Sequence, residues 1–178
     1  MNYFGVAVFL ALGATFISAR TTKTQLEEAL NTVDKIWTVF RSYQRDGQHG
    51  ENSCVYAKTK DLKGDDYTFE QGFKSGSVWQ NETLYGKLSE QGGEAVLTVS
   101  RTQGAERGIV YTLKKWDNQN HCGVLTFTGA NNVLQCELHV WEQNLRSKTP
   151  PCHEMYKENC ENEQEFTVCK SECLEKVA

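Results

Sequence analysis

The seven cysteines constrain the fold of this 178-residue chain more than any other feature of its sequence. They are Cys54, Cys122, Cys136, Cys152, Cys160, Cys169 and Cys173. In an oxidising compartment cysteines pair by default, and an odd number leaves one thiol free or available for an intermolecular bond. Zinc binding is the alternative, because two of the cysteines adjoin His121 and His153. The spacings do not match a structural zinc site, so we expect disulfides, with no metal and no cofactor.

The N-terminus indicates which compartment the chain enters. Residues 6–17 form an uncharged apolar run that ends in Ser18 and Ala19. The run is shorter than the ~20 residues that span a bilayer, and small residues flank a cleavage position after Ala19. A buried N-terminal helix is the alternative. We predict a signal peptide over 1–19, a secreted and extracellular protein, and a single domain over 20–178.

Charge and surface signals narrow the class of protein further. The formal net charge is −4, and basic and acidic residues are interspersed along the chain. No basic cluster is long enough to follow a phosphate backbone, so nucleic acid is not an expected partner. No segment after residue 19 is apolar enough to predict a membrane span. Asn81-Glu82-Thr83 is an N-glycosylation sequon and predicts a glycan on Asn81 at the protein surface.

Hydrophobic periodicity predicts one short helix followed by strands. Thr24-Gln25-Leu26-Glu27 is a capping box, and Leu26, Leu30, Val33 and Trp37 recur at helical spacing, so we expect a helix that ends near Asp34. From Ile36 the period changes to two. Eight runs separated by turn sequences then indicate an antiparallel meander that closes into a barrel or folds into a sandwich. The runs are 36–43, 53–59, 66–73, 77–88, 94–101, 108–116, 123–129 and 133–141.

The character of the chain changes after Trp141, where the composition becomes charged. Pro150-Pro151 is typical of the first turn of a helix, because proline there loses no amide that the helix needs. Cys152, Tyr156 and Cys160 share one face of that helix. We therefore expect two thiols directed at the sheet, and a tail that is tied back by the last two cysteines.

Several short strings carry a resemblance to a known family. They are Asp34-Lys35-Ile36-Trp37 leading into Phe40-Arg41-Ser42-Tyr43, Asn52-Ser53-Cys54-Val55, Cys122-Gly123-Val124, Cys136-Glu137-Leu138, and Pro150-Pro151-Cys152 through Tyr156 to Cys160. In these strings and in element order the chain resembles the tick salivary lipocalins, which include histamine- and serotonin-binding proteins. The likeness spans nearly all of 20–178, although 61–107 matches only in pattern. It implies a mainly β fold: an eight-stranded antiparallel lipocalin-type barrel with a short N-terminal helix and a C-terminal helix, stapled by disulfides.

The resemblance also implies a disulfide connectivity, which the spacing of the cysteines alone leaves open. In the implied connectivity Cys54 pairs with Cys173, Cys122 with Cys152 and Cys136 with Cys160. Two bridges then fix the C-terminal helix to the barrel, and one ties down the tail. Cys169 is the odd thiol, unless it takes the place of Cys173.

A lipocalin barrel has room for one small ligand, and alternate residues on each strand face its interior. If Cys136 points outward to reach the C-terminal helix, then Glu137, His139 and Trp141 point inward. A carboxylate beside aromatic rings suits an organic cation, because ion pairing and cation–π attraction act together in a dry cavity. Amine binders of this family carry an aspartate where this chain has Gly123, and tryptophan or tyrosine where it has His139. The carboxylate of Glu137 is retained.

Other candidate residues come from positions that align with ligand contacts in the histamine binders. Tyr43, Asp46 and Glu82 align in this way, whereas His49 stands where those proteins have an aromatic residue. The stretch 110–112 lacks their acidic residue, which implies that one amine site is kept and a second is lost. The complete candidate set is Tyr43, Asp46, Glu82, Tyr111, Glu137, His139 and Trp141.

Most of these candidates also have a purely structural interpretation. A neighbouring tyrosine or arginine can satisfy Glu137, an interior hydrogen bond can account for His139, and the turn motif at 45–47 can account for Asp46. Large aromatic side chains commonly fill protein cores. That alternative applies to Trp37, Trp79 and Trp141.

The favoured function is a secreted carrier that sequesters a small host mediator, most specifically histamine or serotonin, and so suppresses host inflammation. The second ligand class is a lipid such as a leukotriene, a fatty acid or a sterol, with Arg41 or His139 holding its polar group. The third hypothesis is an immune modulator that binds a host protein, in which a free Cys169 could form a covalent dimer. An enzyme is not expected, because the sequence lacks a Gly-x-Ser-x-Gly elbow, a paired-histidine zinc helix and a phosphate-binding glycine loop.

Overall fold

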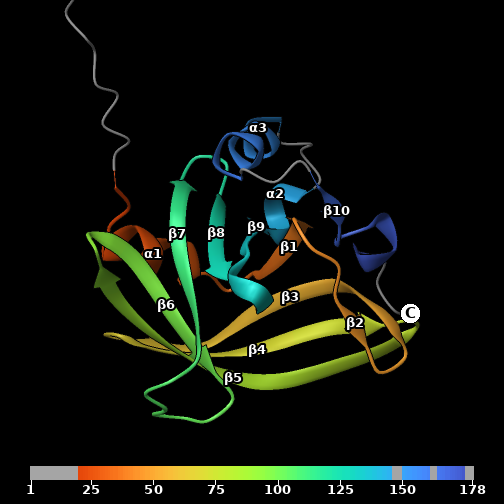
Figure 1. Cartoon of the computed structure of the whole chain (residues 1–178), viewed down its shortest axis with the longest axis horizontal. Coiled ribbons are helices and arrows are strands. Elements are labelled where there is room, and N and C mark those ends of the chain that lie inside the picture. Colours follow the sequence, from red (N-terminus) through yellow and green to blue (C-terminus); the bar gives the residue numbers. More distant parts are fainter. Residues whose placement is uncertain (1–19, 146–149, 161–163, 175–178) are drawn as a thin grey trace, which may run out of the picture.

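The predicted strands form one closed antiparallel barrel in a computed structural model that describes residues 20–145, 150–160 and 164–174 (Figure 1). The sheet order is β10-β1-β9-β8-β7-β6-β5-β4-β3-β2, and an additional β1–β3 pairing closes the ring. The predicted signal peptide, 1–19, lies outside the described residues. The strands are β1 (Lys35–Arg41), β2 (Asp46–Gly47), β3 (Gly50–Lys63), β4 (Asp66–Ser75), β5 (Val78–Gln91), β6 (Glu94–Ser100), β7 (Ile109–Asp117), β8 (Cys122–Thr128), β9 (Leu134–Trp141) and β10 (Phe166–Thr167). The eight-stranded meander is therefore confirmed, and two short strands are added to it.

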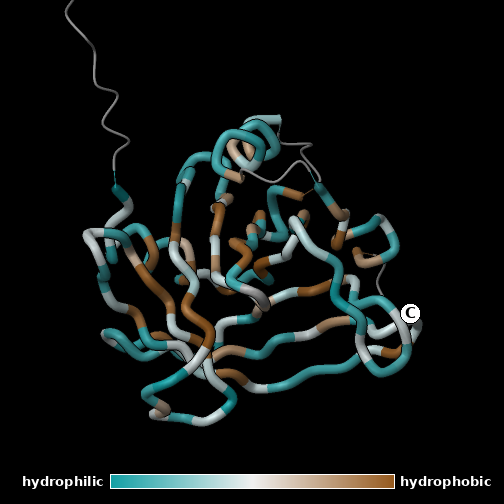
Figure 2. The backbone as a smooth tube through the Cα atoms, viewed as in Figure 1, coloured by the Kyte–Doolittle hydropathy of each residue, from teal (hydrophilic) through white to brown (hydrophobic). Residues whose placement is uncertain are grey.

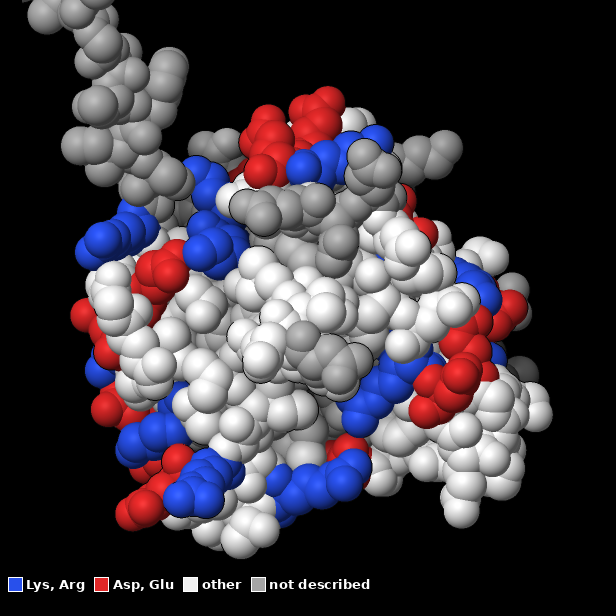
Figure 3. Space-filling model, viewed as in Figure 1, with Lys and Arg blue, Asp and Glu red and all other residues white. Residues whose placement is uncertain are grey.

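Alternation along the strands separates the barrel interior from its outer surface. Figure 2 shows hydrophobic and hydrophilic residues interspersed along the strands, as expected where one face is buried. One core cluster lies inside the barrel and lines much of its cavity, and a second lies outside the wall between β9 and the C-terminal helix. On the face drawn in Figure 3, basic and acidic side chains are interspersed around a broad uncharged centre.

The first helix, α1 (Lys23–Leu30), closes one end of the barrel. Leu26, Ala29 and Leu30 are buried in the core cluster of the barrel, and Lys23 pairs with Asp65 beyond the end of β3. Burial of this apolar face is the main stabilising contribution, because a helix of eight residues is marginal by itself. The helix thus forms the floor beneath the interior.

Three details of the predicted first helix are wrong. The N-cap is Thr22, which forms a capping box with Gln25, and Thr24 lies inside the helix. The helix ends at Leu30, and Val33 is 92 % exposed after it. Trp37 lies on β1 and not on the helical face. The chain has to leave the helix early, because β1 begins at Lys35 and runs up the barrel wall.

Replacing Thr22 with alanine should destabilise the protein by about 1 kcal/mol, because an orphan amide of the first turn loses its acceptor. Thr24→Ala is the matched control: its side chain is exposed within the helix, and alanine is the better helix former. Urea unfolding of the two variants measures the difference. Equal stability of the two variants would contradict the observed cap.

The C-terminal part lies against the outside of the barrel. It comprises the short α2 (Glu142–Leu145), α3 (Pro150–Asn159) and a 3-10 turn over Ser171–Leu174, while another 3-10 turn, Ala130–Asn132, lies between β8 and β9. The predicted helix start at Pro150 is confirmed. α3 packs on β8 and β9, where Tyr156 and Met155 are buried. This covers the outward face of the strand that carries Glu137.

Three disulfides join these elements, and they are the three pairs that the resemblance implies. Cys122–Cys152 and Cys136–Cys160 hold α3 and its end to β8 and β9, and Cys54–Cys173 holds the tail to β3. The seventh cysteine, Cys169, is a half-buried free thiol. Burial raises its pKa to about 12, which keeps it in the protonated form that is a poor nucleophile.

The tail also completes the barrel wall. Only the first part of β1, Lys35 to Trp37, pairs with β3. Farther along, β1 pairs with β10, and Val168 donates its amide to Val39 and accepts a hydrogen bond from the Cys54 amide. The segment around Val168 therefore fills the gap between β1 and β3. A strand of two residues is too short for the sequence pattern to predict this role.

Candidate functional site

The barrel encloses a cavity of about 670 Å³, which is within the range of small-molecule sites in proteins. Every residue of the candidate set borders it. These residues are Tyr43, Asp46, Glu82, Tyr111, Glu137, His139 and Trp141. The sequence pattern and the resemblance therefore selected residues from four separate segments of the chain, 43–46, 82, 111 and 137–141, that the fold brings to one cavity.

The lower half of the cavity is apolar. Its floor is α1, and its walls carry aliphatic and aromatic side chains. They include Leu26, Leu30, Tyr67, Phe69, Leu84, Leu97, Leu113, Trp116 and Trp141. Trp141 donates its indole N–H to the backbone carbonyl of Ala29, at 2.9 Å, so its only polar atom is satisfied within the floor. This half can take the hydrophobic part of a ligand.

The three predicted inward residues of β9 do face the cavity. Glu137, His139 and Trp141 line it, whereas Cys136, Leu138 and Val140 pack against α3 in the second core cluster. The assumption that Cys136 points outward therefore holds, because its partner Cys160 lies at the end of that helix.

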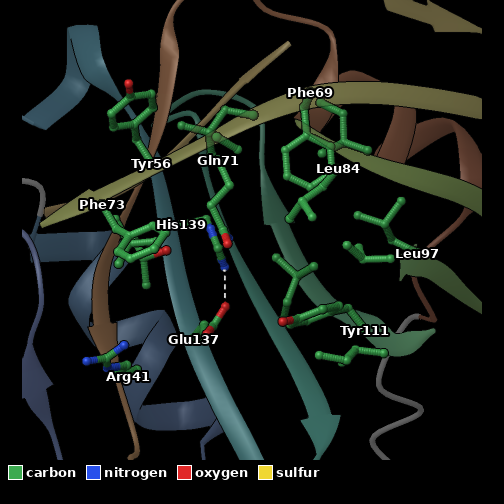
Figure 4. Close-up of a pocket in the computed structure, with 18 of the residues that line it drawn as sticks. Arg41, Tyr56, Phe69, Gln71, Phe73, Leu84, Leu97, Tyr111, Glu137 and His139 are labelled. Atoms are coloured by element: carbon green, nitrogen blue, oxygen red, sulfur yellow. Dashed lines mark hydrogen bonds and ion pairs between the residues drawn. The ribbon is translucent and has the colours of Figure 1, made fainter. Parts of the chain in front are cut away.

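Glu137 is the polar centre of the cavity, and its carboxylate accepts hydrogen bonds at both oxygens; Figure 4 shows the bond with His139. The Tyr43 hydroxyl donates to one oxygen, and the His139 Nε2–H donates to the other at 2.9 Å. The Glu137 residue as a whole is only 8 % exposed. A neighbouring tyrosine therefore satisfies Glu137 and an interior hydrogen bond engages His139, as the structural alternative expects, yet both side chains still border open space.

The pKa of Glu137 is lowered despite its burial. Desolvation alone raises this pKa, but the hydrogen bond and the charge of His139, the hydrogen bond from Tyr43 and the charge of Arg41 outweigh it. Burial, followed by the charge of Glu137, raises the pKa of Tyr43 far above its ordinary value, so its hydroxyl stays protonated as a donor. The cavity therefore holds one buried anionic side chain at neutral pH.

This pKa makes Glu137 a contributor to stability at neutral pH. Because its pKa is lower in the folded chain than the ordinary value of 4.5, its contribution is complete above about pH 4.5 and is lost as the pH falls through the folded pKa. Wild-type stability should therefore fall more steeply below pH 4.5 than that of Glu137→Gln. Thermal melts from pH 3 to 7 measure this, and parallel pH profiles for the two proteins would contradict the assignment.

Aromatic rings lie next to this carboxylate. Tyr43 and Tyr111 both contact Phe127, with ring centroids 5.5 Å and 4.9 Å apart. The guanidinium of Arg41 lies 5.2 Å from the Tyr43 ring and donates to the carbonyl of Asn52 at 2.6 Å. Glu137 thus lies among aromatic side chains and near the charge of Arg41, one nitrogen of which donates to the backbone.

The other two candidate carboxylates lie towards the mouth. Glu82 forms an ion pair with Arg101, whose Nε lies 2.8 Å from a carboxylate oxygen, and Asp46 is exposed on β2. The expected turn at 45–47 is instead the start of the β2–β3 pairing, with Asp46 opposite Glu51. The charged groups at the mouth are therefore in contact with solvent, whereas the carboxylate of Glu137 is buried.

The packing of Trp116 explains why position 123 is a glycine. A Cβ atom on Gly123 would lie 3.2 Å from the Trp116 ring and 3.3 Å from the Lys115 carbonyl. Trp116 thus occupies the space beside the position where family members carry an aspartate. His49, which stands where the histamine binders have an aromatic residue, is exposed in the turn between β2 and β3.

Some cavity residues were missed, although the same alternation could have found them. Tyr67, Phe69, Gln71 and Phe73 are alternate residues of β4, and all four face the cavity. Gln71 projects towards His139 and Glu137 in Figure 4. Conversely, the expectation that Trp37 and Trp79 fill the barrel is wrong. Trp37 packs outside the wall with Cys54 and Cys173, and Trp79 is 39 % exposed.

The structure shows neither a metal site nor a membrane helix in the part of the chain that it describes. Among residues 20–145, 150–160 and 164–174, no three histidine, cysteine, aspartate or glutamate side chains are grouped so that they could hold a metal ion. The cysteines beside His121 and His153 are both disulfide-bonded, so the zinc alternative is wrong. No helix within these ranges has the length and apolar character needed to cross a membrane.

Comparison with known proteins connects this geometry to one family. The family model described as tick histamine binding protein matches residues 18–175. No curated protein sequence matches the chain significantly.

Solved structures share the fold at low sequence identity. Japanin from Rhipicephalus appendiculatus, bound to cholesterol, has a TM-score of 0.56 at 14 % identity and covers 82 % of this chain and 98 % of its own. The AM182–serotonin complex has a TM-score of 0.60 at 13 % identity, covering 83 % and 91 %. The siderocalin Ex-FABP has a TM-score of 0.56 at 14 % identity, covering 80 % and 95 %. These likenesses show a lipocalin-type barrel.

Proposed function

The chain belongs to the tick histamine-binding protein family, and from that premise we propose that it binds an organic ammonium ligand, histamine or serotonin, inside its barrel. The protein would be a secreted salivary carrier that removes a host mediator by stoichiometric binding, without catalysis, and so suppresses inflammation. A structural neighbour is described as a serotonin complex, which supports a ligand of this class.

The observation that carries the proposal is the buried, ionised carboxylate of Glu137 in an aromatic setting. An ammonium group needs a counter-ion that is already desolvated and π faces beside it, and Glu137, Tyr43 and Tyr111 provide both. A carboxylate has about four lone-pair positions, of which Tyr43 and His139 use two. The ligand nitrogen can therefore add to Glu137 without displacing its protein partners.

Other observations support the proposals that the protein is secreted and that it is not an enzyme. Three disulfides are typical of a chain that matures in an oxidising compartment, and residues 1–19 have the pattern of a signal peptide. The matched family and the solved neighbours are binding proteins. Because such a carrier binds its ligand stoichiometrically, it would have to be secreted in large amounts to remove the ligand.

A lipid is the second candidate, and the apolar lower half of the cavity favours it. A biogenic amine fills only part of about 670 Å³, whereas a sterol or an acyl chain would occupy the space above α1. Arg41 and His139 stand at the polar end, where a hydroxyl or carboxylate would lie. Japanin, a structural neighbour, is described as bound to cholesterol.

Isothermal calorimetry of the oxidised protein separates the two candidates. We expect serotonin or histamine to bind with one-to-one stoichiometry, and 5-hydroxytryptophol, which replaces the amine of serotonin with a neutral hydroxyl, to bind at least tenfold more weakly. Cholesterol and a leukotriene are titrated in parallel. Lipid binding without amine binding would replace the proposal by its alternative, and no binding of any of these ligands would favour a protein partner.

A further inference from the structure

Three aromatic residues lie next to one another across β1, β3 and β5, and of these three Tyr56 alone also borders the cavity. Trp37 on β1 lies 5.3 Å from Tyr56 on β3, measured between ring centroids, and Tyr56 lies 6.2 Å from Trp79 on β5. Trp37 is buried, Tyr56 is half-buried and Trp79 is 39 % exposed. We call Tyr56 and Trp79 the aromatic shelf. An exposed tryptophan beside a second ring is a surface that favours a partner.

The strand register places Asn81 directly beside this shelf. Tyr56 pairs with Gly72 across β3 and β4, and Gly72 pairs with Asn81 across β4 and β5. Gly72 has no side chain, and a Cβ atom there would lie 2.2 Å from the Tyr56 ring, so the tyrosine ring covers the glycine. The tyrosine ring is therefore the side-chain neighbour of Asn81 across β4.

Alternation along β5 keeps the sequon on the same outer face. Trp79, Asn81 and Thr83 are exposed alternate residues, whereas Gln80 and Glu82 between them line the cavity. Trp79 thus precedes Asn81 by two residues on one face of one strand. The overlap of Glu82 with the sequon creates no conflict, because Glu82 and Asn81 point to opposite sides of the wall.

We propose that Asn81 carries an N-linked glycan whose first N-acetylglucosamine packs on the aromatic shelf formed by Tyr56 and Trp79. The C–H face of a pyranose ring is apolar and complements the face of an aromatic ring, while the sugar hydroxyls remain in water. A covalent tether gives the sugar a high effective concentration at the shelf. Lys74 and Lys35, whose ammonium groups lie 5.4 Å from the Trp79 centroid and 4.2 Å from the Tyr56 centroid, can hydrogen-bond its oxygens.

A glycan at this position would stabilise the barrel wall and would not control access to the cavity. The shelf joins β3 to β5 across β4, so a sugar packed on it ties three strands together. The mouth residues Glu82 and Arg101 border the inside of the barrel, on the other side of β5. The docked sugar should therefore raise stability and leave ligand affinity unchanged.

Expression of the full chain in insect cells tests the proposal. Peptide mass spectrometry gives the occupancy of Asn81, and an endoglycosidase trims the glycan to a single N-acetylglucosamine. We expect the trimmed protein to melt several degrees above Asn81→Gln, and this gain to fall by more than half when both are compared in a Trp79→Thr background. Trp79→Tyr, which keeps an aromatic face, should restore most of the gain.

Nuclear Overhauser contacts between the sugar and the Trp79 indole provide a readout that needs no variant. We expect such contacts in the trimmed wild-type protein. An unoccupied Asn81 would overturn the proposal. So would an occupied Asn81 without sugar–indole contacts, or a gain in melting temperature that is the same with and without Trp79.

Discussion

Replacing Glu137 with glutamine should weaken the binding of histamine or serotonin by about 100-fold, because the ammonium group loses a buried counter-ion, the one buried carboxylate among the residues that the structure describes. Glutamine keeps the size of the side chain and can still accept from the Tyr43 hydroxyl. The loss should therefore appear in the affinity for cations and not in the shape of the cavity. Calorimetric titration of wild type and variant with the same amine measures the ratio of the two Kd values.

Glu82→Gln is the matched control for this experiment. Glu82 also lines the cavity, but it is paired with Arg101 near the solvated mouth. Because exposed ion pairs contribute 0 to about 1 kcal/mol, we expect amine affinity to fall by about fivefold or less in this variant. An effect of Glu82→Gln as large as that of Glu137→Gln would place the ammonium group at the mouth and contradict the proposed site.

Removing the disulfide between Cys54 and Cys173 should cost about 5 kcal/mol of stability, because this bridge closes a loop with a sequence separation of 119. It also anchors the segment around Val168 that fills the gap between β1 and β3. The bridges Cys122–Cys152 and Cys136–Cys160 have separations of 30 and 24, and each should contribute about 3.5 kcal/mol. Urea unfolding of the double alanine variants should show this order.

The free thiol of Cys169 must be controlled in that series. It lies near Cys173 in the sequence and could capture an orphaned partner, so each pair is removed in a Cys169→Ser background that is otherwise oxidised. If loss of the Cys54–Cys173 bridge proved less costly than loss of either α3 bridge, its role as the main staple of the barrel would be wrong.

The barrel interior could be predicted where one strand has a clear alternation and a fixed reference residue. On β9, the expectation that Cys136 faces α3 was enough to place Glu137, His139 and Trp141 in the cavity. The strand runs themselves were predictable because β-branched and aromatic residues alternate between turn sequences. The disulfide pairs came from the resemblance, since many pairings of seven cysteines satisfy the spacing alone.

The remaining features depend on contacts that are distant in sequence. Thr22 and Thr24 each precede a glutamine or glutamate by three residues, so the sequence offers two overlapping caps. The fold selects Thr22, with the barrel burying Leu26, Ala29 and Leu30 behind it. β10 has two residues and no local pattern, and the bridge to Cys54 brings the segment that carries it to β1.

The positions of Trp37 and Trp79 were mispredicted for a related reason. Apolar size alone does not say which face of a strand a residue occupies. Trp37 is buried outside the barrel, because the tail and α2 cover that part of β1, and its indole donates to Glu142 at 3.4 Å. Trp79 is one of the β5 residues that point outward, and it lies on the same face as Asn81. Alternation along β5, counted from Glu82 as an inward residue, would have predicted this position.

A crystal structure of the complex with serotonin tests the central claim most directly. We expect the ligand nitrogen within about 3 Å of a Glu137 carboxylate oxygen, with the indole ring among Tyr43, Tyr111 and the apolar wall. A ligand whose nitrogen lies beside Asp46 or Glu82 at the mouth, with Glu137 still bonded only to Tyr43 and His139, would contradict it.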